Sequence, residues 1–378
     1  MSMKYSLIIP VFNRPDEVDE LLESLCHQTV KDFEVLIVED GSQRDCKAVV
    51  DKYSDRLDVK YFMKPNSGPG QSRNYGAERA QGEWLIILDS DVVLPEGYLA
   101  AIKKSIKNEE LRIKNYDYHA ADAHSDECSN HNSSSLIINQ NLAAFGGPDA
   151  AHPSFTPVQK AISYSMTSFF TTGGIRGGKA KLDKFYPRSF NMGIRRDVYL
   201  QLGGFSKMRF GEDIDFSYRI VEAGHQTRLF PDAWVWHKRR TDFRKFFRQV
   251  YNSGIARINL TKRHPGTLKL VHLLPTVFTV GVIGLILISA VGRALMHYVD
   301  REQVYWMCFA PWIPILLYCL IIFVDSSIRN RNLWVGLLSI PAAFVQLMGY
   351  GLGFIESWWK RCILKQDEFT AFERNFYN

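Results

Sequence analysis

Apolar and polar residues follow two different patterns along the chain. In the first part, short apolar runs without polar interruptions are separated by stretches with the spacing of amphipathic helices. An uninterrupted short run is typical of a strand buried on both faces in a parallel sheet. The predicted strands are Tyr5–Ile9, Phe33–Val38, Val59–Phe62 and Trp84–Leu88. Strands that alternate with helices predict an α/β domain with right-handed crossovers.

After about residue 270 the apolar stretches become long. Residues 270–291, 304–324 and 333–355 contain almost no charge. Each stretch has about the 20 residues that a helix needs to cross a bilayer. Buried helices of a large soluble core are the alternative, but three in succession are rare there. We therefore predict a transmembrane region over residues 270–378 with about three helices.

A basic and aromatic segment, residues 246–269, precedes the first long apolar stretch. Its amphipathic pattern predicts a helix lying on an anionic membrane surface, with a solvated basic surface as the alternative. The net charge of +6 is compatible with an anionic substrate or an anionic membrane and selects neither. No nucleic-acid recognition module accompanies the basic residues, so we expect no nucleic-acid partner. Residues 1–245 then form the predicted catalytic domain.

Two carboxylates directly follow the last predicted strand. Asp89 and Asp91 are separated by one residue, and residues i and i+2 of an extended chain point to the same side. They therefore face the carboxyl end of the sheet, where open α/β sheets bind ligands. Hard oxygen donors in this position suit Mg²⁺ or Mn²⁺ held against a diphosphate. An isolated pair of this kind is otherwise a solvated turn.

Several motifs occur in an order that resembles a known family. SLIIPVFNRPDEVDELLESL, VLIVEDGS and NSGPGQSRNYGAERAQGEWLIILDSD resemble the nucleotide-sugar half of a family 2 glycosyltransferase with the GT-A fold. FNMGIRR, LGGF and GEDIDFSYR resemble its acceptor half. The resemblance covers roughly residues 4–240 and implies a Rossmann-like, mostly parallel sheet, followed here by the α-helical transmembrane region.

The resemblance also implies roles for individual residues. Asp91 is the expected metal ligand, Asp89 contacts the ribose or the metal through water, and His237 completes the site for Mn²⁺ or Mg²⁺. A lone histidine is more often structural, and that alternative stays open. The residues expected at the donor are Pro10, Val11, Asn13, Glu39, Asp40, Arg73 and Asp89. Glu39 stands where the family usually has an aspartate, which leaves the nucleotide base open.

The acceptor side centres on two adjacent acidic residues. The resemblance assigns the catalytic base to Asp213, preceded by Glu212, at the start of a predicted helix. This position favours the ionised form, although the carboxylates could instead only cap the helix. The glycine-rich loop at Gly173 and Gly174 is a candidate lid over the acceptor or the donor. Residues 111–140 are polar and without period, which predicts an exposed, mobile insertion rather than a metal site.

These features predict a membrane-anchored, metal-dependent inverting glycosyltransferase of the hexosyltransferase type. We expect it to move one sugar from a nucleotide-sugar donor to a lipid-linked or glycan acceptor in cell-envelope biosynthesis. The alternatives are a processive polysaccharide synthase and a degenerate, non-catalytic sugar-nucleotide-binding membrane scaffold. Processive membrane synthases of the resembled family have a Q-x-x-R-W motif, and this sequence has none, which disfavours the synthase. The N-terminal apolar run is too short for a signal peptide, and none of the six cysteines stands in a C-x-x-C pair. We therefore expect reduced thiols and a cytoplasmic catalytic domain at the inner membrane.

Overall fold

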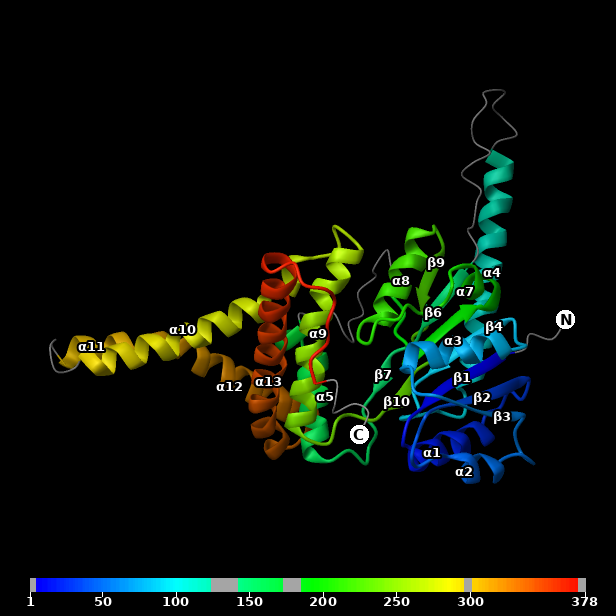
Figure 1. Cartoon of the computed structure of the whole chain (residues 1–378), viewed down its shortest axis with the longest axis horizontal. Coiled ribbons are helices and arrows are strands. Elements are labelled where there is room, and N and C mark those ends of the chain that lie inside the picture. Colours follow the sequence, from blue (N-terminus) through cyan, green and yellow to red (C-terminus); the bar gives the residue numbers. More distant parts are fainter. Residues whose placement is uncertain (1–4, 124–141, 173–184, 296–300, 373–378) are drawn as a thin grey trace. The chain divides into compact units, whose positions relative to one another are not determined.

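The computed structural model describes residues 5–123, 142–172, 185–295 and 301–372 (Figure 1). The chain divides into two compact units. The first comprises residues 1–152 and 180–238, and the second comprises residues 153–179 and 239–378. Each unit is built around its own packed elements.

A seven-stranded sheet forms the centre of the first unit, with the order β3-β2-β1-β4-β8-β6-β9. Its first four strands in the chain are mutually parallel, as predicted from their uninterrupted apolar runs. Their bounds are β1 (Tyr5–Val11), β2 (Phe33–Asp40), β3 (Val59–Lys64) and β4 (Trp84–Leu88). Completing the sheet are β6 (Leu142–Gly146), β8 (Asn191–Arg195) and β9 (Gln226–Leu229). β8 runs antiparallel to β4 and β6, so the sheet is mixed but mostly parallel.

Helices connect the parallel strands as the sequence pattern predicts. They are α1 (Pro15–Cys26), α2 (Lys47–Asp51) and α3 (Pro69–Arg79). The apolar face of α1, which includes Val18 and Leu22, is buried in the core of the sheet. α1 begins at Pro15, which occupies its first turn, and Arg14 is its N-cap. Asp16, a residue type that is common at N-caps, therefore lies inside the first turn instead.

The remaining elements of the first unit are three helices and a small sheet. The helices are α4 (Tyr98–Ala123), α7 (Arg196–Gln201) and α8 (Glu212–Glu222). A small sheet has the order β5-β10-β7, with β5 (Val92–Val93), β7 (Asp149–Ala150) and β10 (Val235–His237). The start of the predicted mobile insertion is wrong, since residues 111–123 continue α4 as a helix. Residues 124–140 of that insertion lie outside the described residues.

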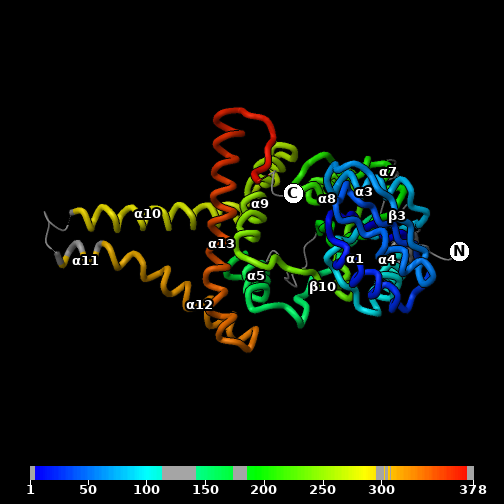
Figure 2. The backbone as a smooth tube through the Cα atoms, turned by 60° about the horizontal axis from the view of Figure 1, so that its bottom comes forward, coloured from blue at the N-terminus to red at the C-terminus, as the bar shows by residue number. Residues whose placement is uncertain are grey.

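Helices make up the second unit (Figure 2). They are α5 (Pro157–Thr167), α6 (Phe169–Thr172), α9 (Phe243–Arg263), η1 (Leu270–His272), α10 (Leu274–Leu295), α11 (Arg301–Phe309), η2 (Ala310–Trp312), α12 (Ile313–Asn330), α13 (Leu333–Trp358) and η3 (Trp359–Ile363). Among the described residues, Leu270–Ala294, Ala310–Asn330 and Leu333–Ile363 are helical, long and apolar enough to cross a membrane. The predicted helix over 304–324 is divided, because Pro311 and Pro314 lie where α11 gives way to η2 and α12.

The predicted domain boundary needs one correction. Residues 153–179 were expected within the catalytic domain, whereas α5 packs inside the helical unit. Its Ala161 is buried against Val335 and Ala342 of α13, and Ile162 is buried against Phe246 of α9. The apolar face of α5 thus finds its partner among helices that are distant in sequence, which local periodicity cannot reveal.

Candidate functional site

Two carboxylates and one imidazole meet beyond the carboxyl end of β4. β10 pairs antiparallel with β5, so His237 lies opposite Val92, and the Lys238 N–H donates to the carbonyl oxygen of Asp91 at 3.0 Å. His237 Nε2 consequently lies 3.3 Å from Asp91 Oδ1 and 4.0 Å from Asp89 Oδ2. One ligand atom from each of the three side chains lies within 4.8 Å of the other two. The structure therefore brings together the three residues predicted to hold a metal.

The donor set of this cluster fits a divalent cation. Mg²⁺ prefers an all-oxygen shell, whereas an imidazole nitrogen beside carboxylates also suits a transition metal such as Mn²⁺. The ring of Phe190 stacks on His237 with centroids 5.1 Å apart, and Asp149 Oδ2 lies 3.7 Å from His237 Nδ1. Such neighbours fix the orientation of a ligating imidazole. Arg14 Nη1 lies 2.8 Å from Asp91 Oδ2, so this carboxylate also has a cationic neighbour.

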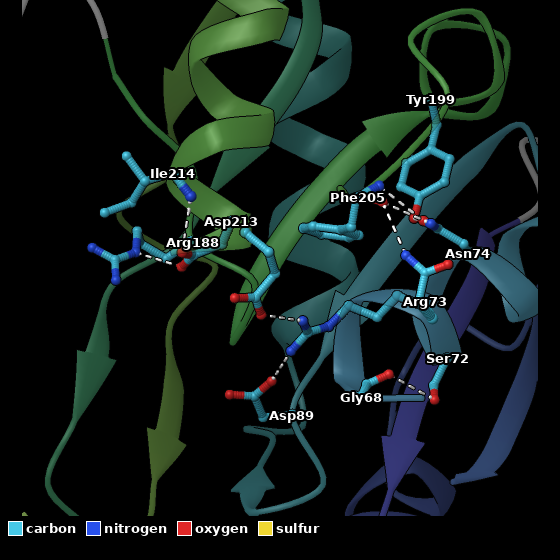
Figure 3. A network of polar contacts seen from close by, with 12 residues as sticks. Gly68, Ser72, Arg73, Asn74, Asp89, Arg188, Tyr199, Phe205, Asp213 and Ile214 are labelled. Carbon is cyan, nitrogen blue, oxygen red and sulfur yellow. Dashed lines mark hydrogen bonds and ion pairs between the residues drawn. The ribbon is translucent and has the colours of Figure 1, made fainter. Parts of the chain in front are cut away.

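A buried arginine connects this cluster to the acidic pair of α8 (Figure 3). Arg73 on α3 donates from Nη2 to Asp89 Oδ1 at 2.7 Å and from Nη1 to Glu212 Oε1 at 2.9 Å. Its side chain is only 4% exposed, and its guanidinium lies over the ring of Phe205, 5.2 Å from the centroid. One side chain thus holds carboxylates from two elements that are far apart in the sequence. The contact of Arg73 with a donor diphosphate remains a prediction.

Asp213 lies in the first turn of α8 and is held from two sides. Arg188 Nε donates to its Oδ2 at 2.6 Å, and the Ile214 N–H donates to its Oδ1 at 2.8 Å (Figure 3). The turn before the helix passes through Gly211 at φ +85°, a left-handed conformation that favours glycine. Burial by itself raises the pKa of Asp213, but the guanidinium of Arg188 outweighs it and lowers that pKa below its usual value.

Glu212 differs from its neighbour in its electrostatic environment. Burial raises the pKa of Glu212, and the opposing guanidinium of Arg73 only partly compensates for the lost hydration. The adjacent carboxylate of Asp213 raises it further. The two acidic residues therefore have pKa values that are shifted in opposite directions, and Asp213 is the one that stays ionised most readily.

The other residues predicted at the donor lie at the carboxyl ends of β1 and β2 and in the loop after β1. Asp40 accepts hydrogen bonds from the N–H groups of Ser67 and Gly68, at 2.9 and 2.8 Å, and forms an ion pair with Lys64. Glu39 is fully buried and accepts a hydrogen bond from the N–H of Cys46 at 3.0 Å. Both carboxylates hold the backbone of neighbouring loops, and their contact with a nucleotide remains a prediction.

Asn13 links the loops that follow β1 and β2. It has a left-handed φ of +55°, its N–H donates to Ser42 Oγ at 2.7 Å, and its Oδ1 accepts from the N–H of Gln43 at 2.9 Å. Pro10 and Val11 end β1 beside this link, with Val11 buried and Pro10 partly exposed. Gly173 and Gly174 lie outside the described residues.

Comparison with known proteins explains this combination of motifs. Residues 6–161 match the family model described as glycosyl transferase family 2, and residues 189–324 match the model described as glycosyl transferase family group 2. The chain belongs to glycosyltransferase family 2. The two matches together include both halves of the site, from β1 through Asp213 to His237.

The relatives match limited parts of this chain. An uncharacterized glycosyltransferase of Rickettsia felis is 42% identical over 88 residues, which are 23% of this chain and 15% of the relative. A GalNAc(5)-diNAcBac-PP-undecaprenol beta-1,3-glucosyltransferase of Campylobacter jejuni is 36% identical over 104 residues, 26% of this chain and 33% of the relative. The chain thus spans a third or less of the length of these two relatives.

A solved structure supports the fold. The mannosyltransferase PcManGT of Pyrobaculum calidifontis, in complex with GDP-Man and Mn²⁺, has a TM-score of 0.53 at 12% identity. The alignment covers 96% of this chain and 88% of that one. The predicted GT-A fold of this family 2 glycosyltransferase is therefore confirmed.

Two cations in this site were missed by the sequence analysis. Arg14 contacts Asp91, and Arg188 contacts Asp213. The sequence motifs assigned no role to either arginine. A signal for Arg14 was present, because it follows β1 at the same sheet edge as Asp91 follows β4. Arg188 precedes the quoted FNMGIRR motif closely, but nothing local indicates that it turns toward α8.

Proposed function

We propose that this glycosyltransferase is metal-dependent and inverting, and that it moves one sugar from a nucleotide-sugar donor to an acceptor hydroxyl. The observation that best supports this proposal is the pair of hydrogen bonds that Arg73 donates to Asp89 and Glu212. Through it, one buried guanidinium joins a candidate metal ligand, Asp89, to Glu212, the residue next to the candidate base. A nucleotide diphosphate beside Asp89 would therefore present its sugar toward Asp213.

Asp91, Asp89 and His237 are the residues that would hold Mn²⁺ or Mg²⁺. A divalent cation there would neutralise the negative charge that develops on the departing diphosphate. Arg14 contributes a fixed positive charge on the same carboxylate and would favour an anionic donor next to it. Phe190 keeps the imidazole plane of His237 from rotating.

Asp213 would act as the general base. Its lowered pKa keeps it ionised at neutral pH, so that it can accept the proton of the acceptor hydroxyl. The hydroxyl oxygen forms its bond to the anomeric carbon while the bond to the diphosphate oxygen breaks on the opposite face. One displacement of this kind inverts the anomeric configuration. The proton ends on the carboxylate of Asp213 and the nucleoside diphosphate leaves.

We propose a lipid-linked acceptor at the cytoplasmic face of the inner membrane, within cell-envelope glycan biosynthesis. Three long apolar helices and the basic helix α9 support a membrane location. The Campylobacter relative, whose printed name describes an undecaprenol-linked glycan, supports an acceptor of the lipid-linked class. An acceptor of this kind would reach the enzyme from the membrane.

The test measures transfer by purified full-length protein in detergent, with UDP-, GDP- and dTDP-sugars and membrane lipid extract, with and without Mn²⁺ or Mg²⁺. We expect metal-dependent release of one nucleotide, abolished by Asp91→Ala and by Asp213→Asn. Asp55→Ala, an exposed carboxylate of the same unit, is the matched control and should retain activity. Electron paramagnetic resonance should show Mn²⁺ binding to wild type and Asp213→Asn and not to Asp91→Ala.

Other outcomes would contradict the proposal in distinct ways. Long polymer as the product would identify a processive synthase. Donor binding by calorimetry without any transfer or hydrolysis, across all donors and lipid fractions, would identify a non-catalytic scaffold. Retained activity in Asp213→Asn, with a product that carries a single added sugar, would show that Asp213 is not the base.

A further inference from the structure

The C-terminal tail of the chain lies against the helix that precedes the first apolar span. Asn252 on α9 donates to the carbonyl oxygen of Ala371 at 3.0 Å and accepts from the N–H of Ala371 at 2.9 Å. Further along α9, Asn259 donates to the carbonyl oxygen of Phe369 at 3.3 Å, and Arg263 forms an ion pair with Glu368 at 2.8 Å. Asn252 and Asn259 are buried in these contacts. The tail is therefore a packed part of the second unit.

This contact constrains how often the chain crosses the bilayer. α9 ends at Arg263, just before the first apolar helix, and the tail begins just after the third. Residues that exchange hydrogen bonds lie on the same side of the membrane. Three crossings between Arg263 and Glu368 would place them on opposite sides. An even number of crossings is required, so at least one of the three candidate helices does not cross.

The third candidate, α13, runs in parallel alongside α9. Val345 packs near Phe246, a Cβ added at Gly349 would meet Val250, and one at Gly353 would meet the Tyr251 carbonyl oxygen at 2.0 Å. Later along both helices, the Ser357 hydroxyl donates to the Ile255 carbonyl oxygen at 3.2 Å, and Lys262 Nζ donates to the Arg361 carbonyl oxygen at 2.5 Å. The residue numbers of the contacting pairs increase together along both helices, so α13 and α9 run in the same direction over several turns (Figure 2).

The charge of α9 determines the orientation that both helices can adopt. α9 carries six basic residues and no acidic one: Arg244, Lys245, Arg248, Arg257, Lys262 and Arg263. Each Lys or Arg at the centre of a bilayer costs about 2.5–3.5 kcal/mol on insertion scales. α9 therefore lies along a membrane surface rather than across it, with its basic residues toward anionic headgroups. A helix packed along its length has the same orientation.

The other flank of α13 is also covered by a helix that does not cross. Ala161 of α5 packs against Val335 and Ala342, and Tyr164 packs beside Ala343. The segment that contains α5 is short and is continuous with the first unit at both ends of its sequence. In agreement, 44% of the apolar window of α13 is buried inside the protein, compared with 11% for each of the other two candidates.

α10 and α12 have the properties of a hairpin in lipid. The rings of Phe278 and Tyr318 lie 5.7 Å apart, and Trp312 Nε1 donates to Ser289 Oγ at 2.9 Å, so the two helices run antiparallel. α10 is 22 residues long, which is about 33 Å and enough for the hydrocarbon layer. The base of this hairpin packs on α13, as the contacts of Ile322 with Ala343 and of Thr279 with Leu347 show, and from there the hairpin extends away from α9, α13 and α5 in both views (Figures 1 and 2).

We propose that α10 and α12 are the two membrane crossings and that α9, α13 and α5 form a platform in the plane of one leaflet. The platform binds an anionic lipid surface through the basic residues of α9. α11 then lies at the opposite membrane surface, and the tail returns to the side of α9. The tail residues Lys360, Arg361 and Lys365 agree with this side, since basic residues concentrate on the cytoplasmic side of a membrane.

The test is labelling of full-length protein in sealed membrane vesicles with a membrane-impermeant maleimide, read at each site by peptide mass spectrometry. Cys362 is native and exposed, so the tail needs no substitution. Glu302→Cys reports α11, Arg331→Cys reports the turn between α12 and α13, and Lys52→Cys reports the first unit; all three replaced side chains are exposed. Arg331 has a left-handed φ of +49°, and because arginine itself carries a Cβ, its replacement by cysteine adds no new backbone strain.

We expect Cys362 and Arg331→Cys to react on the same side as Lys52→Cys, and Glu302→Cys to react only after the vesicles are opened or inverted. Labelling of Cys362 together with Glu302→Cys would mean that α13 crosses, and it would overturn the proposal. Labelling of all four sites from one side would mean that the hairpin does not cross, which also overturns it. The outcome is independent of donor, acceptor and catalytic activity.

Discussion

Replacing Arg73 with methionine should destabilise the first unit in a pH-dependent way. The variant keeps most of the apolar stem but removes the cation from Glu212 and Asp89, whose side chains are 10% and 30% exposed. Water screens Asp89 in part, so most of the loss comes from Glu212. Removing one partner of a buried ion pair costs about 3–5 kcal/mol.

Proton uptake by Glu212 limits this loss. Burial already raises the pKa of Glu212 to about 7, and without Arg73 that pKa rises further. With a folded pKa of about 7 and an unfolded pKa of about 4.5, Glu212 already costs the wild type about 3.0 kcal/mol at pH 7. A variant in which Glu212 stays protonated loses about 0.4 kcal/mol more than the wild type at pH 7 and about 2 kcal/mol more at pH 8.5. A group with a raised folded pKa contributes stability that is complete below the unfolded pKa and is lost as the pH rises. The contribution of Glu212 to the loss in Arg73→Met should therefore vanish at pH 5.5, where the carboxyl is protonated in wild type and variant alike, and should reach about 2 kcal/mol at pH 8.5.

The measurement is thermal unfolding of the full chain in detergent at pH 5.5, 7 and 8.5, with hydrogen exchange of the α3 and β4 peptides to locate the change. We expect the melting temperature of the variant, relative to wild type, to fall by about 4–8 °C more at pH 8.5 than at pH 5.5. Glu212→Gln in the Arg73→Met background should recover this pH-dependent part of the loss, with a coupling of about 2 kcal/mol at pH 8.5. Arg79→Met, an exposed arginine on the same helix, is the matched control. A loss that grows as the pH falls, or stays below about 1 kcal/mol at every pH, would refute the reasoning.

Three further changes test other parts of the structure. Gly147→Ala would place a Cβ 1.7 Å from a backbone carbonyl oxygen and should cost about 2–3 kcal/mol in thermal unfolding, whereas Gly97→Ala, with nothing within 4 Å, should cost nothing measurable. Arg188→Met removes the cation that lowers the pKa of Asp213, so the acid limb of kcat/KM should move to higher pH; an unmoved limb would separate Asp213 from catalysis. Gly353→Val should separate α13 from α9 and speed hydrogen exchange in both, while donor affinity measured by calorimetry stays unchanged.

The sheet was predictable because burial on both faces leaves a simple sequence pattern. The predicted run Trp84–Leu88 matches β4 at both ends, since its apolar residues stop at the first carboxylate. Helix starts were harder: Asp16 has the chemistry of an N-cap, yet Pro15 fixes the start of α1 one position before it. The helix over 111–123 was missed because its polar residues carry no apolar period, although many of them favour helix.

The site was predictable where chemistry and strand position coincide, and not where contacts are long-range. Asp89 and Asp91 follow β4 directly, and His237 ends β10, so their position at one edge follows from the strands. The bond from Arg73 to Glu212 joins residues 139 positions apart, and the bond from Arg188 to Asp213 depends on where a loop turns. Such pairings are set by tertiary packing, which a local sequence motif does not reveal.

The membrane region shows the same limit in a different form. A hydropathy window measures the free energy of moving a helix from water into lipid, and it returns a similar value whether the apolar surface faces lipid or another helix. In α13, 44% of the apolar window is covered by protein, in part because Gly349 and Gly353 admit the side chain and backbone of α9 at close range. The residues that decide its orientation are the polar ones of its partners, above all Asn252 and Asn259, which fix the tail beside α9. Topology is thus specified by hydrogen bonds outside the apolar segments as much as by the segments themselves.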